Sequence, residues 1–489
     1  MVKAGIGITR RQLLHRGAQG AAGLAFAGLG GELVTRALAA GSKAPPLPQW
    51  RSRPDLKIPA LTVAHSQPGA SADPIFIAPY NAPRGAQAGA VIVDALGQPI
   101  WENPLANKVT TNFRVQSYRG SPVLTWWEGF IELGHGVGEY VIADASYTTV
   151  RRVQAGRGLH ADLHEFLITP QQTALYTSYV VRAADLRSVG GPRNGTIQDA
   201  IFQEQDLATG EVLLEWHSLE HIALEESYWP VGANWDFFHL NSIDVDHDGN
   251  LLISARSTHT VYKLDRRSGA VLWRLGGKRS DFELGSGARF AWQHDARTRL
   301  DGRLTVFDNG AAPAVERHSR GLILELDERA MRAALVSQYT HPHVLAGSQG
   351  NVQLLPGGNV FVGWGEIPRV SEFHRSGRLV FDAILGKDYE CYRAFRLPWH
   401  ATPAEAPALA LTRAASGELT AYASWNGATD VAAWRLLAGD SAAAMRPITA
   451  TGATGFETAI RTAAAGAALA VQALDAGGAR IGQSGLVSV

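Results

Sequence analysis

The sequence predicts an all-β protein, in which a six-bladed β-propeller is followed by a small immunoglobulin-like or fibronectin-like β-sandwich. Three observations support this prediction: one hairpin motif recurs along the chain, a second hairpin motif lies upstream of it, and the composition changes near the C-terminus. The 52 glycines and 23 prolines among 489 residues follow no fixed period. That usage is typical of a protein with many tight turns.

The first repeated motif is a polar turn between two apolar strands, and its second strand carries an aromatic residue. Each copy has Asp, or in one case His, at the start of the turn and Gly within it. The Asp side chain can cap such a turn and Gly can adopt positive φ, so the motif predicts a β-hairpin. The four copies occupy residues 94–101, 206–216, 265–273 and 374–381.

A second hairpin lies upstream, most clearly at residues 243–254 and 352–363 and more loosely at 166–177 and 298–307. The two hairpins together make a four-stranded antiparallel unit, which is the blade of a propeller. Residues 389–399 are left over, and we expect them to supply a strand to the first blade and close the ring. The six units begin near Pro74, Asn112, His160, Phe238, Trp292 and Gln349.

The predicted domains are a targeting segment at residues 1–40, the propeller at 41–404 and the sandwich at 405–489. The last region is rich in Ala, Gly and Thr and contains short alternating strands, for example at residues 419–425. Its length and pattern fit a small sandwich.

The N-terminus predicts export. Residues 9–14 form a twin-arginine pattern, residues 17–29 are weakly apolar, and residues 37–39 have the small-x-small form of a cleavage site. Glu32 and Arg36 interrupt the apolar stretch, which makes it too short for a membrane anchor. We therefore expect passage through the twin-arginine translocase and a secreted or cell-envelope location, and we find no other membrane segment.

Charge and cysteine content exclude some functions. Lys plus Arg and Asp plus Glu both number 45, so no basic field is present to hold nucleic acid. Cys391 is the single cysteine of the sequence, and an intramolecular disulfide is therefore impossible.

Three histidines precede the hairpin strand at corresponding positions of three units: His164, His239 and His294. Equivalent positions of different blades meet near a propeller axis, so we expect one cluster. Three histidines can also bind a metal. However, no two of them have short ligand spacing, and the adjacent Glu165 and Asp295 should point to the opposite side of their strands. We therefore expect no metal.

Further polar residues accompany these histidines. Asn241 lies two residues after His239, on the same face of an extended chain. Arg256 ends the return strand of that hairpin, and Ser348 has a comparable position in the sixth unit. A surface salt bridge is the alternative interpretation of Arg256. A guanidinium, an amide and imidazoles together suit a sulfuryl or phosphoryl group.

The sequence resembles the arylsulfotransferase family in several stretches, which lie at residues 113–127, 163–166, 238–256 and 292–310. The resemblance implies a six-bladed propeller that moves a sulfuryl group between phenols without a nucleotide donor. It assigns His294 as the transiently sulfated residue, and His239, Asn241 and Arg256 as groups that hold the sulfuryl oxygens. It makes His164 a further active-site histidine and places Ser348 where the family has a small hydroxyl residue.

Two features depart from the family pattern. Its best-known members carry a disulfide that Cys391 alone cannot form. The C-terminal sandwich also stands in place of their N-terminal domain.

The expected function is transfer of a sulfuryl group from an aryl sulfate donor to a phenolic acceptor, by a ping-pong route through sulfo-histidine and without a cofactor. One alternative is a quinoprotein-like propeller oxidoreductase, whose repeat is similar, but six units rather than eight argue against it. Another is a non-catalytic cell-surface binding propeller, against which the presence of both His294 and Arg256 argues.

Overall fold

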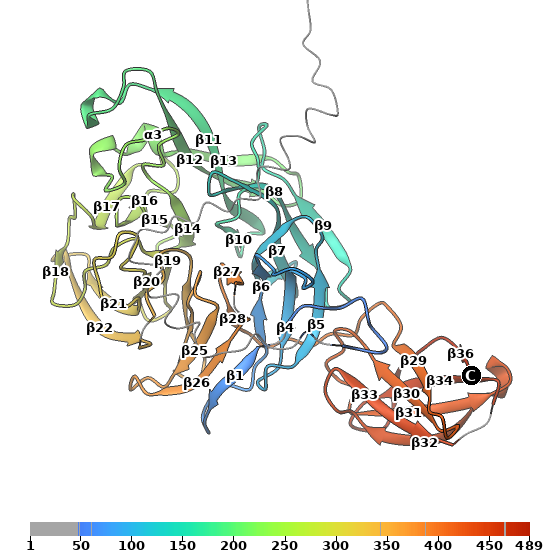
Figure 1. Cartoon of the computed structure of the whole chain (residues 1–489). Coiled ribbons are helices and arrows are strands. Elements are labelled where there is room, and N and C mark those ends of the chain that lie inside the picture. The colour runs from blue at the N-terminus through green and yellow to red at the C-terminus, as the bar shows by residue number, and fades with distance from the viewer. Residues whose placement is uncertain (1–46, 48, 60, 343, 387, 464–465) are drawn as a thin grey trace, which may run out of the picture. The chain divides into compact units, whose positions relative to one another are not determined.

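The computed structural model describes residues 47, 49–59, 61–342, 344–386, 388–463 and 466–489 (Figure 1). The predicted targeting segment therefore lies outside the described residues. Within the described part the chain is built from strands, and its helices are single turns, which confirms the all-β class. None of these helices is long and apolar enough to span a bilayer. The short helices are α3 (Ser218–His221), η1 (Arg187–Val189), η2 (Leu224–Glu226) and η3 (Ala442–Ala444).

Six antiparallel sheets follow one another along the chain, and in each the neighbouring strands are mostly consecutive. The first sheet contains β2 (Ile75–Ile77), β4 (Gly89–Val93), β5 (Pro99–Pro104) and β28 (Phe395–Arg396). The second contains β6 (Val109–Tyr118), β7 (Ser121–Glu132), β8 (His135–Ala143) and β9 (Thr149–Val153). The third contains β10 (Phe166–Ile168), β11 (Thr173–Ala184), β12 (Gly195–Asp206) and β13 (Val212–His217).

The remaining three sheets have the same plan, with one added strand in two of them. The fourth contains β14 (Leu240–Val245), β15 (Leu251–Ala255), β16 (Thr260–Leu264) and β17 (Val271–Gly276). The fifth contains β18 (Glu283–Leu284), β19 (His294–Thr298), β20 (Leu304–Asp308), β21 (Arg320–Asp327) and β22 (Arg332–Thr340). The sixth contains β1 (Thr62–Ser66), β23 (Asn351–Leu354), β24 (Val360–Gly363), β25 (Arg369–Phe373) and β26 (Leu379–Ile384).

The segment left over by the repeats pairs with the start of the chain. β27 (Glu390–Cys391) pairs with β3 (Pro79–Tyr80), and β28 pairs with β2. Two other pairings have no counterpart in the repeat pattern. β1 joins the edge of the sixth sheet beside β26, and β18 pairs with β22 in parallel.

The repeated turns have the predicted chemistry. The glycines of the four copies all have φ between 72° and 88°. In the third copy, Asp265 Oδ1 accepts hydrogen bonds from the backbone N–H of Arg267 (3.1 Å) and of Ser268 (2.7 Å). In the fourth copy His374 replaces the aspartate, and its Nδ1 accepts from the Ser376 N–H at 3.2 Å. These bonds cap each hairpin in the way the motif predicts.

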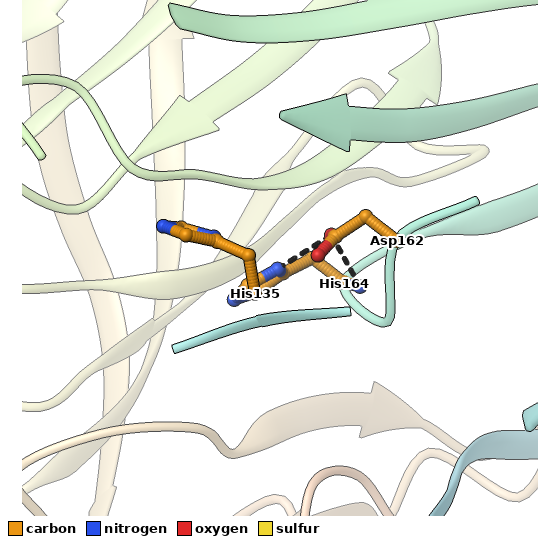
Figure 2. A group of neighbouring side chains, drawn as sticks. All are labelled: His135, Asp162 and His164. Carbon is orange, nitrogen blue, oxygen red and sulfur yellow. Dashed lines mark hydrogen bonds and ion pairs between the residues drawn. The ribbon is translucent and has the colours of Figure 1, made fainter. Parts of the chain in front are cut away.

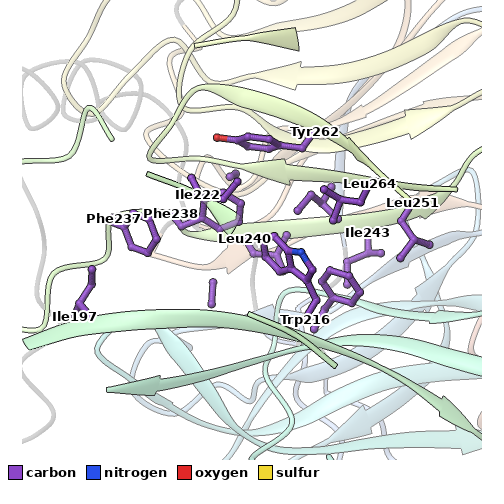
Figure 3. Close-up of a cluster of buried hydrophobic side chains, with 14 of the residues drawn as sticks. Ile197, Trp216, Ile222, Phe237, Phe238, Leu240, Ile243, Leu251, Tyr262 and Leu264 are labelled. Carbon is purple, nitrogen blue, oxygen red and sulfur yellow. The ribbon is translucent and has the colours of Figure 1, made fainter. Parts of the chain in front are cut away.

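The repeated aromatic residue connects one sheet to the next. The Trp216 indole is buried and donates from Nε1 to the carbonyl oxygen of Gly269, the turn glycine of the following copy, at 3.0 Å. A Cβ atom at Gly269 would approach Trp216 Cδ1 to 2.8 Å, so this position also needs glycine for space. Around Trp216 an apolar cluster fills the space between the third and fourth sheets (Figure 3).

The C-terminal region forms two further sheets whose side chains share one apolar cluster around Trp425 and Trp434. One sheet contains β29 (Ala408–Arg413), β30 (Leu419–Ser424) and β33 (Glu457–Thr462). The other contains β31 (Ala433–Gly439), β32 (Arg446–Gly452), β34 (Ala468–Leu474), β35 (Arg480–Gln483) and β36 (Val487–Ser488).

Candidate active site

The structure gathers the three histidines of the repeat pattern in one place. His164 lies just before β10, His239 just before β14, and His294 is the first residue of β19. The ring centroids of His164 and His239 are 4.9 Å apart, and those of His239 and His294 are 6.3 Å apart. Three different sheets thus contribute one imidazole each to a single cluster.

The tautomer of His294 is set by Asn309. The Asn309 amide donates from Nδ2 to the carbonyl oxygens of Ala346 (3.1 Å) and Gln349 (3.0 Å), which leaves its Oδ1 as an acceptor. That oxygen lies 2.8 Å from His294 Nδ1, so Nδ1 carries the proton. The opposite nitrogen, Nε2, accepts the Gln349 N–H at 3.2 Å. Neutral His294 therefore has its ring lone pair at Nε2, where it accepts the hydrogen bond from Gln349.

Two of the histidines are held in the neutral form. Burial, together with the positive charge of Arg256, lowers the pKa of His294 well below its usual value. Burial also lowers the pKa of His239 to about 4, although the neighbouring Asp236 acts in the opposite direction. At neutral pH both rings therefore keep an unprotonated nitrogen.

Arg256 is a buried cation that forms no ion pair with a carboxylate of the described residues, although Asp236 and Glu366 are near enough to raise its pKa against the effect of burial. Its Nη2 donates to the carbonyl oxygen of Gly347 at 3.0 Å, and its Nε is buried without a hydrogen-bond partner in the described chain. The guanidinium lies 5.2 Å from the ring centroid of Trp229 and 5.1 Å from that of Trp292. Among the described residues it forms no ion pair, so the surface salt bridge considered from the sequence is absent. A cation in this position is available to an anionic ligand.

Asn241 and Ser348 lie at this site with partners of their own. The Asn241 amide is buried and donates to the carbonyl oxygen of Gln293 at 2.8 Å. The Ser348 hydroxyl donates to Glu366 Oε2 at 3.0 Å. The backbone at His239 has φ of 54°, in the left-handed region. The alternation of an extended chain, from which Asn241 was placed on the face of His239, therefore does not apply at this point.

Two carboxylates that the repeat pattern does not reveal hold the histidine rings. Asp162 Oδ2 lies 2.7 Å from His164 Nδ1 and also accepts the backbone N–H of His164 at 3.0 Å (Figure 2). Asp236 Oδ2 makes a short hydrogen bond with Nδ1 of His239. Because each carboxylate takes the Nδ1 side, the Nε2 side of both rings is left for other partners. Asp162 precedes His164 by two residues and Asp236 precedes His239 by three, and that spacing is the signal by which the sequence could have indicated them.

Two further aromatic side chains complete the cluster. His135, the first residue of β8, has its ring centroid 5.6 Å from that of His164 and 5.2 Å from that of His239. Tyr392, from the segment between β27 and β28, lies 5.5 Å from His164 and 6.4 Å from His294 by ring centroids. Neither belongs to a repeat copy, so the repeat phase could not reveal them.

A buried ionic cluster is formed by the residues that follow His164 and His294 in the chain. Glu165 Oε1 accepts from Arg114 at 2.9 Å, while its Oε2 pairs with Arg297 and lies 3.2 Å from Arg393 Nη1. Asp295 Oδ1 lies 2.8 Å from Arg297 Nη2 and 3.2 Å from Arg393 Nε. These two carboxylates therefore bind arginines rather than the histidines. Asp295 has φ of 54° and Glu165 precedes β10, so regular strand alternation is not the cause of this arrangement.

Comparison with known proteins assigns the chain to a family. Residues 114–386 match the sequence model of a family described as arylsulfotransferase (ASST). The match spans more than half of the 489 residues, and the chain belongs to the arylsulfotransferase family. Membership of this family indicates a sulfotransferase enzyme that acts on aryl sulfates. No curated protein matches the chain.

Several solved structures are distantly similar. A protein of unknown function from Bacteroides caccae is 13% identical, with a TM-score of 0.40 over 66% of this chain and 98% of that chain. A streptogramin B lyase is 9% identical, with a TM-score of 0.35 over 74% of this chain and 94% of that chain. An inactive variant of virginiamycin B lyase from Staphylococcus aureus is 10% identical, with a TM-score of 0.31 over 66% of this chain and 84% of that chain. Likenesses this distant carry no argument about function.

Proposed function

We propose that the six sheets are the blades of a β-propeller, closed where β28 pairs with β2, and that the two C-terminal sheets form an immunoglobulin-like sandwich. The strand pairing between the two ends of the repeat region supports the closure. The twin-arginine pattern at residues 9–14 supports export to the cell envelope or beyond it. On this fold, the clustered histidines lie where the blades converge.

The proposed reaction is sulfuryl transfer from an aryl sulfate to a phenol through sulfo-histidine, with no nucleotide. In the first half, the hydrogen bond from Gln349 to His294 Nε2 opens and the freed lone pair attacks sulfur. The bond between sulfur and the aryl oxygen breaks, and a phenolate leaves. Arg256 and Asn241 hold the sulfuryl oxygens, and Ser348 lies at the edge of the site. His239 joins them when its Nε2 carries a proton, because a neutral ring with its proton on the Asp236 side has only a lone pair there. In the second half, the oxygen of an acceptor phenol attacks sulfur, the N–S bond breaks, and the phenolic proton passes to His239 or His164.

One observation carries this proposal. A neutral imidazole with a defined lone pair lies beside a buried guanidinium that has no carboxylate partner. Gly347 accepts from Arg256, and Gln349, two residues later, donates to His294 Nε2, so the same short segment holds both groups. A nucleophile next to an unpaired cation is suited to an anionic electrophile such as a sulfate ester.

The direct test uses a chromogenic aryl sulfate and no nucleotide. We expect a stoichiometric burst of phenolate without acceptor and steady turnover when a phenol is added. Turnover that depends on an added adenylyl sulfate donor, or no burst and no turnover with any of a panel of aryl sulfates, would contradict the proposal.

Arg256→Gln is expected to slow the sulfation of the enzyme by about 10²–10³-fold, the usual effect of losing one preorganised donor to a developing negative charge. Glutamine keeps a polar side chain of moderate length but removes the charge. The measurement is the rate of the phenolate burst in a stopped-flow instrument. Arg187→Gln is the matched control, because Arg187 is an exposed arginine paired with Asp185. Equal burst rates for wild type and Arg256→Gln would exclude the role assigned to Arg256.

The pH dependence of the burst should reflect the lowered histidine pKa values. An imidazolium has no lone pair at Nε2, so the burst requires neutral His294. Because burial and the charge of Arg256 lower the pKa of His294 well below its ordinary value, we expect the rate to stay constant as the pH falls from 8 through 6.5. A midpoint near 6.5, the ordinary value for histidine, would show that this ring is more exposed to water than the structure has it.

A further inference from the structure

A second cluster of ligand atoms lies on the far side of His239 from its Nε2. One ligand atom each of His135, Asp236 and His239 lie within 4.8 Å of one another. Nε2 of His135 is 3.2 Å from Asp236 Oδ2, yet the two atoms do not meet the geometry of a hydrogen bond. The three residues therefore converge on a common point, where Asp236 Oδ2 bonds to His239 Nδ1 but both nitrogens of His135 lack a hydrogen-bond partner in the described chain.

His135 is the unusual member of this set. Its side chain is 5% exposed, and neither Nδ1 nor Nε2 has a hydrogen-bond partner among the described residues. The ring is stacked on Tyr179, with centroids 3.7 Å apart and planes at 23°, so it cannot readily swing toward solvent. Asp236 Oδ1 is likewise buried without a partner in the described chain. A buried imidazole and carboxylate oxygen with no partner are costly, and a bound ligand would remove that cost.

We propose that His135, Asp236 and His239 bind a divalent transition-metal ion of the Zn²⁺ type. Two imidazoles and one carboxylate are a donor set that Zn²⁺ and its first-row neighbours prefer over Mg²⁺ or Ca²⁺. Two ligand atoms at about 2.0–2.1 Å from a tetrahedral ion are separated by about 3.3–3.4 Å. The 3.2 Å between His135 Nε2 and Asp236 Oδ2 is close to that separation. His239 Nδ1 bonds directly to the same oxygen, so this bond has to open, with loss of the Nδ1 proton, for the ion to bind.

A second triplet, His135, Asp162 and His164, also has its ligand atoms within 4.8 Å. Asp162, however, is fully occupied. Its Oδ1 accepts from the Gly136 N–H, and its Oδ2 accepts from the Thr177 hydroxyl at 2.8 Å as well as from His164. Asp162 therefore positions His164, while Asp236, with a free Oδ1, is the carboxylate able to bind an ion.

The metal would also change what His239 presents to the reaction. Asp236 faces His239 Nδ1, so an ion bound there takes the place of the Nδ1 proton. The remaining proton then resides on Nε2, which becomes a hydrogen-bond donor toward the histidine cluster, and His164 is then the ring that takes the phenolic proton. This consequence rests on the proposed sulfuryl transfer, for which such a donor would contact a sulfuryl oxygen. The ion binding itself does not depend on it.

The test is calorimetric titration of Zn²⁺ into the untagged full-length protein after removal of metal with a chelator. We expect one Zn²⁺ per chain, with loss of more than about 100-fold in affinity in both His135→Ala and Asp236→Asn, because removal of a ligand should cost at least as much as the loss of an outer hydrogen-bond partner. His135→Gln, which retains the volume of the side chain, should lose binding in the same way. His400→Ala is the matched control, since His400 has 84% of its side chain exposed.

Co²⁺ gives a second readout, because nitrogen-ligated tetrahedral Co²⁺ absorbs in the visible region and Mg²⁺ does not compete for such a site. Absence of a stoichiometric Zn²⁺ site in the wild type, or unchanged affinity in His135→Ala, would overturn the proposal. Loss of binding in His164→Ala with retention in Asp236→Asn would overturn the ligand set. These measurements use no aryl sulfate, so the absence of metal binding would not contradict the sulfuryl-transfer proposal. In the same way, a negative burst assay would not contradict metal binding.

Discussion

His294→Ala is expected to abolish sulfuryl transfer, with a loss of about 10⁴-fold or more, the size of effect seen when a covalent nucleophile is removed. Without Nε2 no sulfo-enzyme can form, so both the phenolate burst and the turnover should disappear. Brief exposure of the wild type to an aryl sulfate should add one sulfuryl group to the peptide that contains His294, and a phenol should remove it. Mass spectrometry of the digested protein measures this directly.

The structure refines the controls for that experiment. His294 is 1% exposed and bonds to Asn309 and Gln349, so its replacement affects the packing and hydrogen bonding of the interior. Truncation to alanine leaves those groups unpaired and should cost about 1–3 kcal/mol of stability. His294→Gln fills the space and can still donate to Asn309, yet it has no nucleophilic ring nitrogen. Both variants should be inactive, and His400→Ala should react like the wild type.

Other results would reassign the chemistry. A label on the peptide of His239 or His164 would keep the reaction class and move the nucleophile. Wild-type turnover in both His294 variants, with no label on any peptide, would indicate direct displacement between two bound phenols.

The strand plan could be predicted because its signal is local. Turn glycines with positive φ and a capping side chain mark each hairpin, and residues 265–273 show both in the structure. The two added strands could not be predicted in this way. β1 pairs with β26, more than 300 positions away, and β18 consists of two residues, so neither pairing leaves a repeat in the sequence. Long-range pairings of this kind are decided by tertiary packing.

The site was predictable only in part for a similar reason. His164, His239 and His294 occupy corresponding positions in three repeat units. Sheets with the same strand order bring such positions together. Asn309, which sets the tautomer of His294, lies in a stretch that resembles the family but has no charge or repeat to single it out. His135 comes from the start of β8, at a different phase, so its approach to His239 depends on how the second and fourth sheets meet.

Glu165→Gln should be the most destabilising of the variants discussed, lowering the free energy of unfolding by about 3–5 kcal/mol, as is usual when one partner of a buried ionic group is removed. Glu165 is fully buried, and Arg114, Arg297 and Arg393 all contact its carboxylate. Glutamine has nearly the same shape, so the change removes charge and little packing. Three buried guanidinium groups would then depend on Asp295 and on more distant carboxylates.

Urea denaturation at pH 7 measures the loss, and its pH dependence shows the cause. Burial alone would raise the pKa of Glu165, but the guanidinium groups of Arg297, Arg393 and Arg114 lower it to about 2. A carboxylate whose pKa is lower in the folded than in the unfolded chain contributes stability that is complete above its unfolded pKa of about 4.3 and is lost as the pH falls toward the folded value. The difference in unfolding free energy between wild type and Glu165→Gln should therefore be largest at pH 7 and clearly smaller at pH 3.

Asp185→Asn is the matched control, because it breaks an exposed pair with Arg187 and should cost no more than about 1 kcal/mol. An equal loss of unfolding free energy in Glu165→Gln and Asp185→Asn would show that the buried ionic cluster around Glu165 contributes little to stability.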